Sequence, residues 1–199
     1  MKKIILLFAV LSLVAFNKKI ITKPSYQLIL KSNIIVAGKV TANDTTQFEI
    51  EIEKEISKNS LGTNLKKGQK LIIAEPRLAY SQYKPFSSVK KDTSYIFYLF
   101  FDEVEKKYFV FDQYVGKITL NENKKFGIYT GKPEFVYFGI DDFDKMIRQF
   151  KEVYFIDPKT NHVTSKLSKD SIFKKYKLND LSKKYFNEVE YFRSQTERK

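Results

Sequence analysis

The chain of 199 residues contains no cysteine and no tryptophan, and His162 is its only histidine. Without cysteine, neither a disulfide nor a thiol nucleophile is available. A zinc site would need carboxylates almost alone, which is uncommon. A Ser–His–Asp set would depend on His162, and the G-x-S-x-G turn of the α/β-hydrolases is missing. We therefore expect a non-enzymatic protein that has no cofactor and no metal site.

Arginine is also scarce, since it supplies only four of the 36 basic residues. The net charge of +13 favours a polyanionic partner in general. Phosphates and base edges, however, are best bound by the planar fork of arginine. A lysine-dominated charge is more typical of a solvated surface. We expect no nucleic-acid or nucleotide partner, which leaves an envelope protein or an anionic envelope surface.

The N-terminus has the pattern of an export signal. Lys2 and Lys3 precede a largely apolar run at 4–16, which ends at Lys18 and Lys19. As a helix this run spans about 20 Å, whereas the hydrocarbon core of a bilayer is about 30 Å thick. The cleavage motif is weak. We predict that residues 1–19 are a signal peptide or an uncleaved membrane tether, and that the protein is periplasmic, envelope-bound or secreted.

After a short lead-in at 20–33, the chain from Ile34 onward shows the two-residue period of β-strands. The clearest case is the run 48–56, where Phe48, Ile50 and Ile52 alternate with glutamates 49, 51, 53 and 55. Further strands are predicted at 34–40, 69–74, 93–101 and 108–111, and a hairpin is predicted to pair 116–120 with 126–129. The strand at 95–101 is apolar on both faces, so it should be covered on both sides.

Residues 136–199 change to a helical period. Asp141 is the expected N-cap of a first helix that Asp157-Pro158 ends, Ser168 the cap of a second, and Asn179 or Asp180 the start of a third. Strands followed by helices are typical of α+β proteins. The predicted fold is an N-terminal antiparallel OB-like β-barrel over 20–135, followed by a C-terminal helical block over 136–199.

The runs "IIVAGKV", "GQKLIIAEP" and "KDTSYIFYLF", with glycines at 38 and 68, come in an order that resembles the netrin-like/TIMP-like OB-fold barrels of bacterial envelope proteins. The resemblance covers residues 30–130 and implies a small curled barrel. Members of that group often carry cysteines near the mature N-terminus that build an inhibitory edge. This chain has none, so an inhibitor role does not carry over.

The candidate contact surface is the irregular stretch 77–91, which carries Arg77, Tyr80, Tyr83 and Phe86. Aromatic residues on such loops are typical interface anchors. The predicted function is therefore an exported, non-enzymatic binding module of the cell envelope.

Two other functions stay open. The first is an envelope hydrolase that uses carboxylates from two elements around a pocket. The second is an anionic lipid or glycan binder that uses the basic helices of 157–199. For the glutamates at 49–55, pairing with lysines of a neighbouring strand is the simpler expectation. For Asp141, Asp142 and Asp144, helix capping is simpler than a calcium site.

Overall fold

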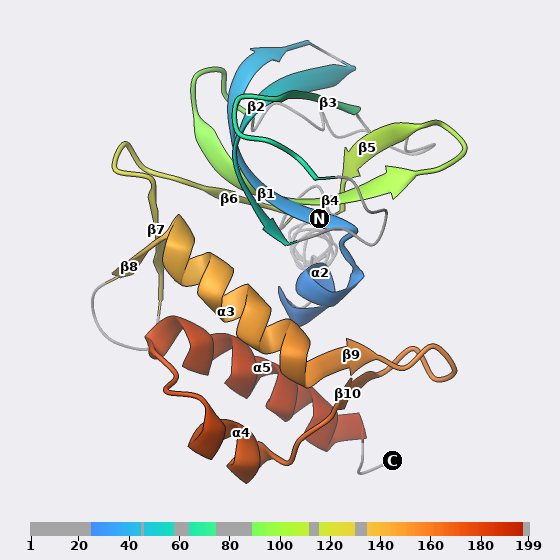
Figure 1. Cartoon of the computed structure of the whole chain (residues 1–199), viewed down its shortest axis with the longest axis vertical. Coiled ribbons are helices and arrows are strands. Elements are labelled where there is room, and N and C mark those ends of the chain that lie inside the picture. The colour runs from blue at the N-terminus through green and yellow to red at the C-terminus, as the bar shows by residue number, and fades with distance from the viewer. Residues whose placement is uncertain are drawn as a thin grey trace, which may run out of the picture.

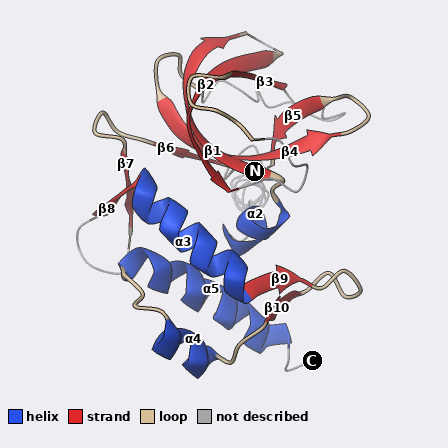
Figure 2. Ribbon diagram, viewed as in Figure 1, coloured by secondary structure: helices blue, strands red, loops and turns tan. Residues whose placement is uncertain are grey.

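The computed structural model describes residues 25–44, 46–57, 64–74, 89–111, 116–129 and 135–196. Strands dominate the first part of these ranges and helices dominate the last part (Figure 1, Figure 2). The predicted α+β class, with a barrel followed by helices, is confirmed. No helix in the described ranges is long and apolar enough to cross a membrane. The predicted signal segment 1–19 lies outside the described residues.

Five strands close into a barrel in the order β1–β2–β3–β5–β4–β1. They are β1 (Ile34–Asn43), β2 (Gln47–Ser57), β3 (Lys70–Ala74), β4 (Ser94–Asp102) and β5 (Lys107–Val110). Every neighbouring pair is antiparallel except β3 and β5, which run parallel. Along the chain, β4 comes between β3 and β5. In the barrel, β5 lies between β3 and β4. The barrel is therefore mixed at this one pairing, and its strand order is consistent with an OB-like fold.

Gly38 lies at an irregularity in the pairing of the first two strands. The register between β1 and β2 shifts beside it, between Ala37 and Gly38. A Cβ atom at Gly38 would lie 3.1 Å from the backbone oxygen of Glu51 and 3.0 Å from Cδ1 of Ile50. The two strands thus approach so closely that only glycine fits without a displacement.

The register shift lets one strand contribute to two hydrophobic cores. Before it, Ile50 and Ile52 point into the barrel, and after it Ile56 packs outside the barrel against the helices. β4 also contributes to both cores, because its successive side chains point to opposite faces. Phe97 lies in the core inside the barrel, and Tyr98 lies in the core between the barrel and the helices, which we call the outer core. The prediction that this strand is covered on both faces is confirmed.

Four helices, two short β-ribbons and a further sheet strand, β6 (Lys117–Thr119), complete the described structure. The helices are α2 (Ser25–Lys31), α3 (Ile140–Val153), α4 (Lys169–Lys175) and α5 (Asp180–Thr196). The ribbons pair β7 (Lys125–Ile128) with β8 (Val136–Gly139), and β9 (Tyr154–Ile156) with β10 (Val163–Ser165). α3 lies between the barrel and α5, and α2 lies below β1 and β4 (Figure 1).

The predicted hairpin between 116–120 and 126–129 is wrong. Its first strand, β6 (Lys117–Thr119), pairs instead with β4, where Ile118 lies opposite Ile96. Its second strand, β7, pairs with β8, so that Phe126 lies opposite Phe138. The turn at 121–124 forms as expected, but Lys124 adopts a positive φ of 56°. The chain leaves the barrel there instead of folding back on β6.

The helix ends were predicted with mixed success. Asp141 is not the N-cap of α3: Gly139 is, and the Asp142 carboxylate accepts the Gly139 N–H at 3.1 Å. α3 also ends before Asp157, because a short strand, β9, follows it directly. The other two starts are confirmed. The Ser168 hydroxyl accepts the Ser171 N–H, and the Asn179 side chain accepts the Ser182 N–H.

Candidate functional site

The predicted contact residues Arg77, Tyr80, Tyr83 and Phe86 lie outside the described residues. Of the stretch 77–91, the structure describes only the last three residues. Val89 among them is 3% exposed and packs into the barrel core. The binding role of the four residues stays a prediction.

Two glutamates of β2, Glu49 and Glu53, are held in place by cations and hydroxyls. Glu49 forms an ion pair of 2.8 Å with Lys70 of the neighbouring strand β3, and it accepts a hydrogen bond of 2.7 Å from Thr41. The Lys70 hydrogen bond, followed by that of Thr41, lowers the pKa of Glu49. The predicted pairing with lysine is therefore confirmed here, and this carboxylate stays ionised as part of a solvated barrel face.

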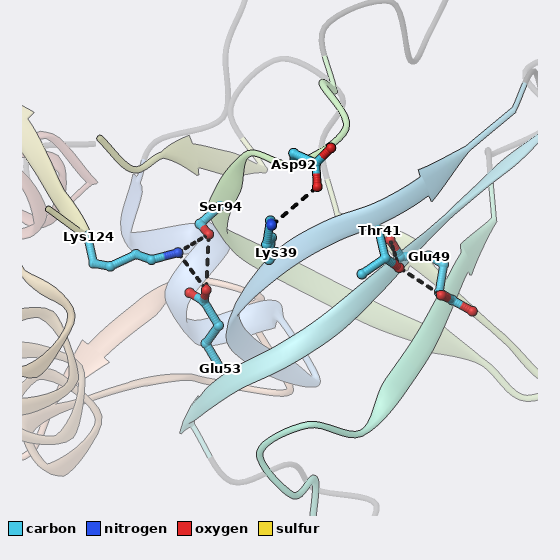
Figure 3. A network of polar contacts seen from close by, with 7 residues as sticks. All are labelled: Lys39, Thr41, Glu49, Glu53, Asp92, Ser94 and Lys124. Atoms are coloured by element: carbon cyan, nitrogen blue, oxygen red, sulfur yellow. Dashed lines mark hydrogen bonds and ion pairs between the residues drawn. The ribbon is translucent and has the colours of Figure 1, made fainter. Parts of the chain in front are cut away.

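Glu53 anchors a second polar cluster, which joins three separate segments. Figure 3 shows Lys124 and Ser94 converging on its carboxylate. Lys124 lies 2.6 Å from Glu53, the Ser94 hydroxyl donates to the same oxygen at 3.1 Å, and Lys124 also donates to Ser94. The Ser94 hydroxyl thus donates a hydrogen bond to Glu53 and accepts one from Lys124. The cluster ties β2, β4 and the turn before β7 together, which is a structural role.

The acidic residues at the start of α3 connect the helix to the barrel. Asp144 is 5% exposed at its side chain and pairs with Lys54 of β2 at 2.8 Å and with Arg148 at 2.7 Å. Burial favours its neutral form, but the Arg148 and Lys54 hydrogen bonds outweigh it and lower the pKa of Asp144. Among the described residues, no group of three His, Cys, Asp or Glu side chains is arranged to hold a metal.

The contacts described for His162 and for the serines near it are local ones. His162 is exposed in the turn between β9 and β10, and its backbone N–H lies 3.3 Å from the Thr160 hydroxyl. The Ser165 hydroxyl donates to the Leu167 carbonyl at 2.6 Å, and Ser168 caps α4. Each hydroxyl therefore has a local structural partner.

A cleft of about 520 Å³ lies where the end of β2 meets α3. Its lining residues are Glu55, Ile56, Ser57, Ile147, Arg148, Lys151 and Glu152. It thus holds one glutamate from a strand and one from a helix, which is the arrangement that the hydrolase alternative needs. Each of these carboxylates has one oxygen bound to the protein: Glu55 accepts the Leu65 N–H, and Glu152 accepts the Tyr176 hydroxyl.

The outer face of the β7–β8 ribbon carries three exposed aromatic side chains. Tyr129, Phe135 and Tyr137 are 58%, 60% and 59% exposed. Tyr129 and Phe135 contact each other edge to face, with 6.4 Å between ring centroids. Tyr137 lies across the ribbon from Gly127. A Cβ atom at Gly127 would lie only 3.2–3.3 Å from the rings of Tyr137 and Phe135, so the glycine leaves room for both.

The inner face of the same ribbon fixes its position. Phe126 and Phe138 are buried in the outer core, and Phe126 meets Phe143 of α3 edge to face at 5.4 Å. An antiparallel ribbon with one buried face normally presents polar side chains on the other. Here the solvent-facing side chains are aromatic instead. We call the group Tyr129, Phe135 and Tyr137 the aromatic face.

The basic C-terminal helices are partly neutralised. Arg193, 20% exposed at its side chain, lies 2.9 Å from Glu190, which also accepts the Tyr154 hydroxyl at 2.7 Å. The lysines of α4 and α5 are exposed. The anionic-surface alternative stays a prediction.

Sequence reasoning missed both the aromatic face and the cleft. A signal for the first exists, since Phe135-Val136-Tyr137-Phe138 is a short strand of unbroken apolar character. The cleft depends on the packing of β2 on α3, for which the sequence has no local signature. No family model matches this chain, and no curated protein or solved structure is significantly similar to it.

Proposed function

We propose that this chain is an exported, non-enzymatic interaction module of the cell envelope, and that it binds an envelope protein through the aromatic face. The observation that carries the proposal is the exposure of Tyr129, Phe135 and Tyr137 on one side of a ribbon whose other side is firmly packed. Exposed clusters of this kind mark interaction sites on soluble proteins. Tyr and Phe are also enriched at the centres of interfaces.

Rigidity supports the choice of this surface. Phe126 and Phe138 hold the ribbon on α3, and the edge-to-face contact between Tyr129 and Phe135 limits the freedom of both rings. Side chains that are already ordered lose little entropy on binding. The net charge of +13 further suggests a partner with an acidic rim, which would accelerate association at low salt.

Export is supported by the sequence alone. The basic start and the short apolar run at 4–16 are the features that favour a periplasmic, envelope-bound or secreted protein. The strand order of the closed barrel is consistent with an OB-like fold, and the netrin-like/TIMP-like relationship is proposed from the sequence pattern at 30–130. Protease accessibility of the tagged full chain in intact and in permeabilised cells tests the location, and protection in both outer-membrane-permeabilised cells and spheroplasts would contradict export.

The binding proposal is tested by site-specific photocrosslinking in living cells. A photoreactive amino acid at position 137 should give a discrete adduct, whereas the same group at Val104, 92% exposed on the turn after β4, should not. The crosslinked protein is then purified and its affinity for the chain measured. The double variant Phe135→Thr/Tyr137→Thr should weaken binding by about tenfold or more.

The control for this measurement is Val104→Thr, which should leave the affinity unchanged. Circular dichroism and thermal unfolding of the double variant separate binding from folding, because the inner face of the ribbon is untouched. Equal adducts at positions 104 and 137, or an affinity that does not respond to the double variant, would overturn the proposal.

A further inference from the structure

A second cleft, of about 540 Å³, lies where the start of α4 meets the C-terminal half of α5. Ser168, the N-cap of α4, and Lys169 form part of its lining. The lining residues of α5 are three or four positions apart, which places them on one face of that helix: Asn187, Glu190, Tyr191, Arg193 and Ser194. We call this space the α4–α5 cleft, and its volume falls within the range of small-molecule sites.

Tyr191 is the aromatic member of this lining. It is 62% exposed, more than any other aromatic residue that the structure describes. Phe192 meets its ring edge to face, with 5.6 Å between ring centroids, and the ring of Phe192 lies in turn 5.5 Å from that of Tyr26 in α2. Aromatic contacts thus hold Tyr191 while most of its surface stays open. A side chain ordered in this way loses little entropy when a ligand packs on it.

Hydrogen-bonding groups line the cleft together with this ring. The Glu190 side chain is 11% exposed, and its Oε1 accepts the Tyr154 hydroxyl at 2.7 Å and the Arg193 guanidinium at 2.9 Å. None of the described residues donates to its Oε2. The amide of Asn187, one helical turn before Tyr191, is exposed and has no hydrogen bond to the described part of the chain. The cleft therefore offers an oriented acceptor from Glu190, and both donors and an acceptor from Asn187.

These groups narrow the chemical class of the ligand. Of the described lining residues Tyr191 alone is apolar, so a hydrocarbon would leave the polar groups around it unpaired. An anion would meet the Glu190 carboxylate, to which the Arg193 guanidinium is already bound. What fits is an uncharged molecule with several hydroxyls and one apolar face. A pyranose sugar has both, because its C–H groups gather on one face of the ring and its hydroxyls lie around the rim.

We propose that the α4–α5 cleft binds a neutral oligosaccharide. One sugar ring packs its C–H face on Tyr191, while neighbouring hydroxyls donate to Oε2 of Glu190 and exchange hydrogen bonds with the Asn187 amide. This cleft lies on the helices, whereas the aromatic face belongs to the β7–β8 ribbon. Sugar binding here therefore does not require the proposed protein partner.

The test is binding of the labelled full chain to an array of immobilised glycans, followed by calorimetric titration with the soluble oligosaccharide that is retained best. The array holds neutral oligomers of hexoses and N-acetylhexosamines, together with acidic oligomers of uronic acids. Neutral glycans should be retained at physiological salt, because the contacts are hydrogen bonds and ring packing rather than screened ion pairs. Retention of no glycan, or of acidic glycans alone, would overturn the proposal.

Variants of two exposed aromatic residues locate the site. Tyr191→Ala should weaken binding of the retained oligosaccharide by about tenfold or more, because it removes the ring on which the sugar packs. Tyr191→Phe keeps the ring and should bind as the wild type does. Phe155→Thr removes a 39% exposed ring outside the cleft and should leave the sugar affinity unchanged. An unaltered affinity in Tyr191→Ala, or equal losses in Tyr191→Ala and Phe155→Thr, would contradict the assignment.

Asn187→Ala tests the polar part of the site independently of the ring. Position 187 is exposed and alanine is the better helix former, so this variant should unfold at the temperature of the wild type or above it. Its affinity for the oligosaccharide should nevertheless fall by about fivefold, because the hydrogen bonds of the amide are lost. An intact fold with unchanged affinity would show that the sugar does not contact Asn187 and would overturn the proposed placement.

Discussion

Lys54 of β2 and Asp144 of α3 form an ion pair, with 2.8 Å between Nζ and Oδ2, across the junction of the barrel and the helices. Asp144 is almost fully buried, and Arg148 approaches it from its own helix. Asp144→Asn should therefore destabilise the protein by about 2 kcal/mol, because Lys54 and Arg148 both lose their charged acceptor. Lys54→Met should cost less, about 1 kcal/mol, since Arg148 still neutralises Asp144. Urea unfolding of the two variants gives the comparison.

The same pair predicts a pH dependence. The pKa of Asp144 is lowered in the folded state by its cationic partners, against the opposing effect of burial. A carboxyl group of this kind stabilises the fold above its unfolded pKa, and the stabilisation is lost as the pH falls through the folded value. Between pH 5 and pH 2, wild type should lose more free energy of unfolding than Asp144→Asn. Parallel acid-unfolding curves for the two proteins would contradict this assignment.

Gly38 should not tolerate even the smallest side chain. Alanine would place its Cβ 3.1 Å from the Glu51 backbone oxygen, and a backbone atom cannot move aside as a flexible side chain can. We expect Gly38→Ala to lower the free energy of unfolding by about 1–3 kcal/mol. Gly139→Ala is the control, because the nearest atom to its added Cβ lies at 3.7 Å and the expected cost is below about 1 kcal/mol. Equal costs in urea unfolding would show that the close approach at Gly38 is not the constraint.

Gly127→Ala probes the aromatic face without removing an aromatic ring. The new methyl group would lie 3.2–3.3 Å from the rings of Tyr137 and Phe135, so these exposed rings should rotate away. The stability should change by no more than about 0.5 kcal/mol, because solvent leaves the rings room to move. NMR should show changed ring contacts, and the affinity for the crosslinked partner should fall. An unchanged affinity with visibly displaced rings would mean that ring geometry does not determine binding.

Glu188 of α5 should make the stability depend on pH in the opposite direction to Asp144. Its Oε1 accepts the Ser25 N–H at 2.7 Å, and burial raises its pKa. A group with a raised folded pKa stabilises the protein fully below its unfolded pKa, and this contribution is lost as the pH rises through the folded value. Glu188→Gln keeps an acceptor for Ser25, so it should become more stable relative to wild type as the pH rises above 5. Glu122→Gln, at an exposed turn, should show no such trend in thermal unfolding.

The features that sequence predicts well are those set by neighbouring residues. The alternation at 48–56 predicts β2 and its solvated glutamates, and the caps at Ser168 and Asn179 are confirmed because a cap is a local hydrogen bond. β4 was correctly expected to be covered on both sides, since no other environment suits consecutive aromatic residues.

The features that sequence does not predict depend on pairing at a distance. The residues of β6 and β7 have the pattern of a hairpin, but the two strands do not pair with each other. β6 pairs with β4 instead, and β7 pairs with β8 while Phe126 packs on Phe143 of α3. The cleft between β2 and α3 is likewise invisible in the sequence, because its residues come from two segments far apart along the chain. It becomes visible only when α3 is placed against the end of β2.

The register shift beside Gly38 has a consequence for how the protein unfolds. Ile52 and Ile56, four residues apart on β2, belong to two different cores, so neither core can melt without disturbing the strand that serves the other. The barrel and the helices should therefore denature in one cooperative transition, with the same midpoint by near-ultraviolet and far-ultraviolet circular dichroism. A fragment ending before residue 136 should not behave as a miniature of the whole chain, because it would leave Ile56, Ile96 and Tyr98 facing water.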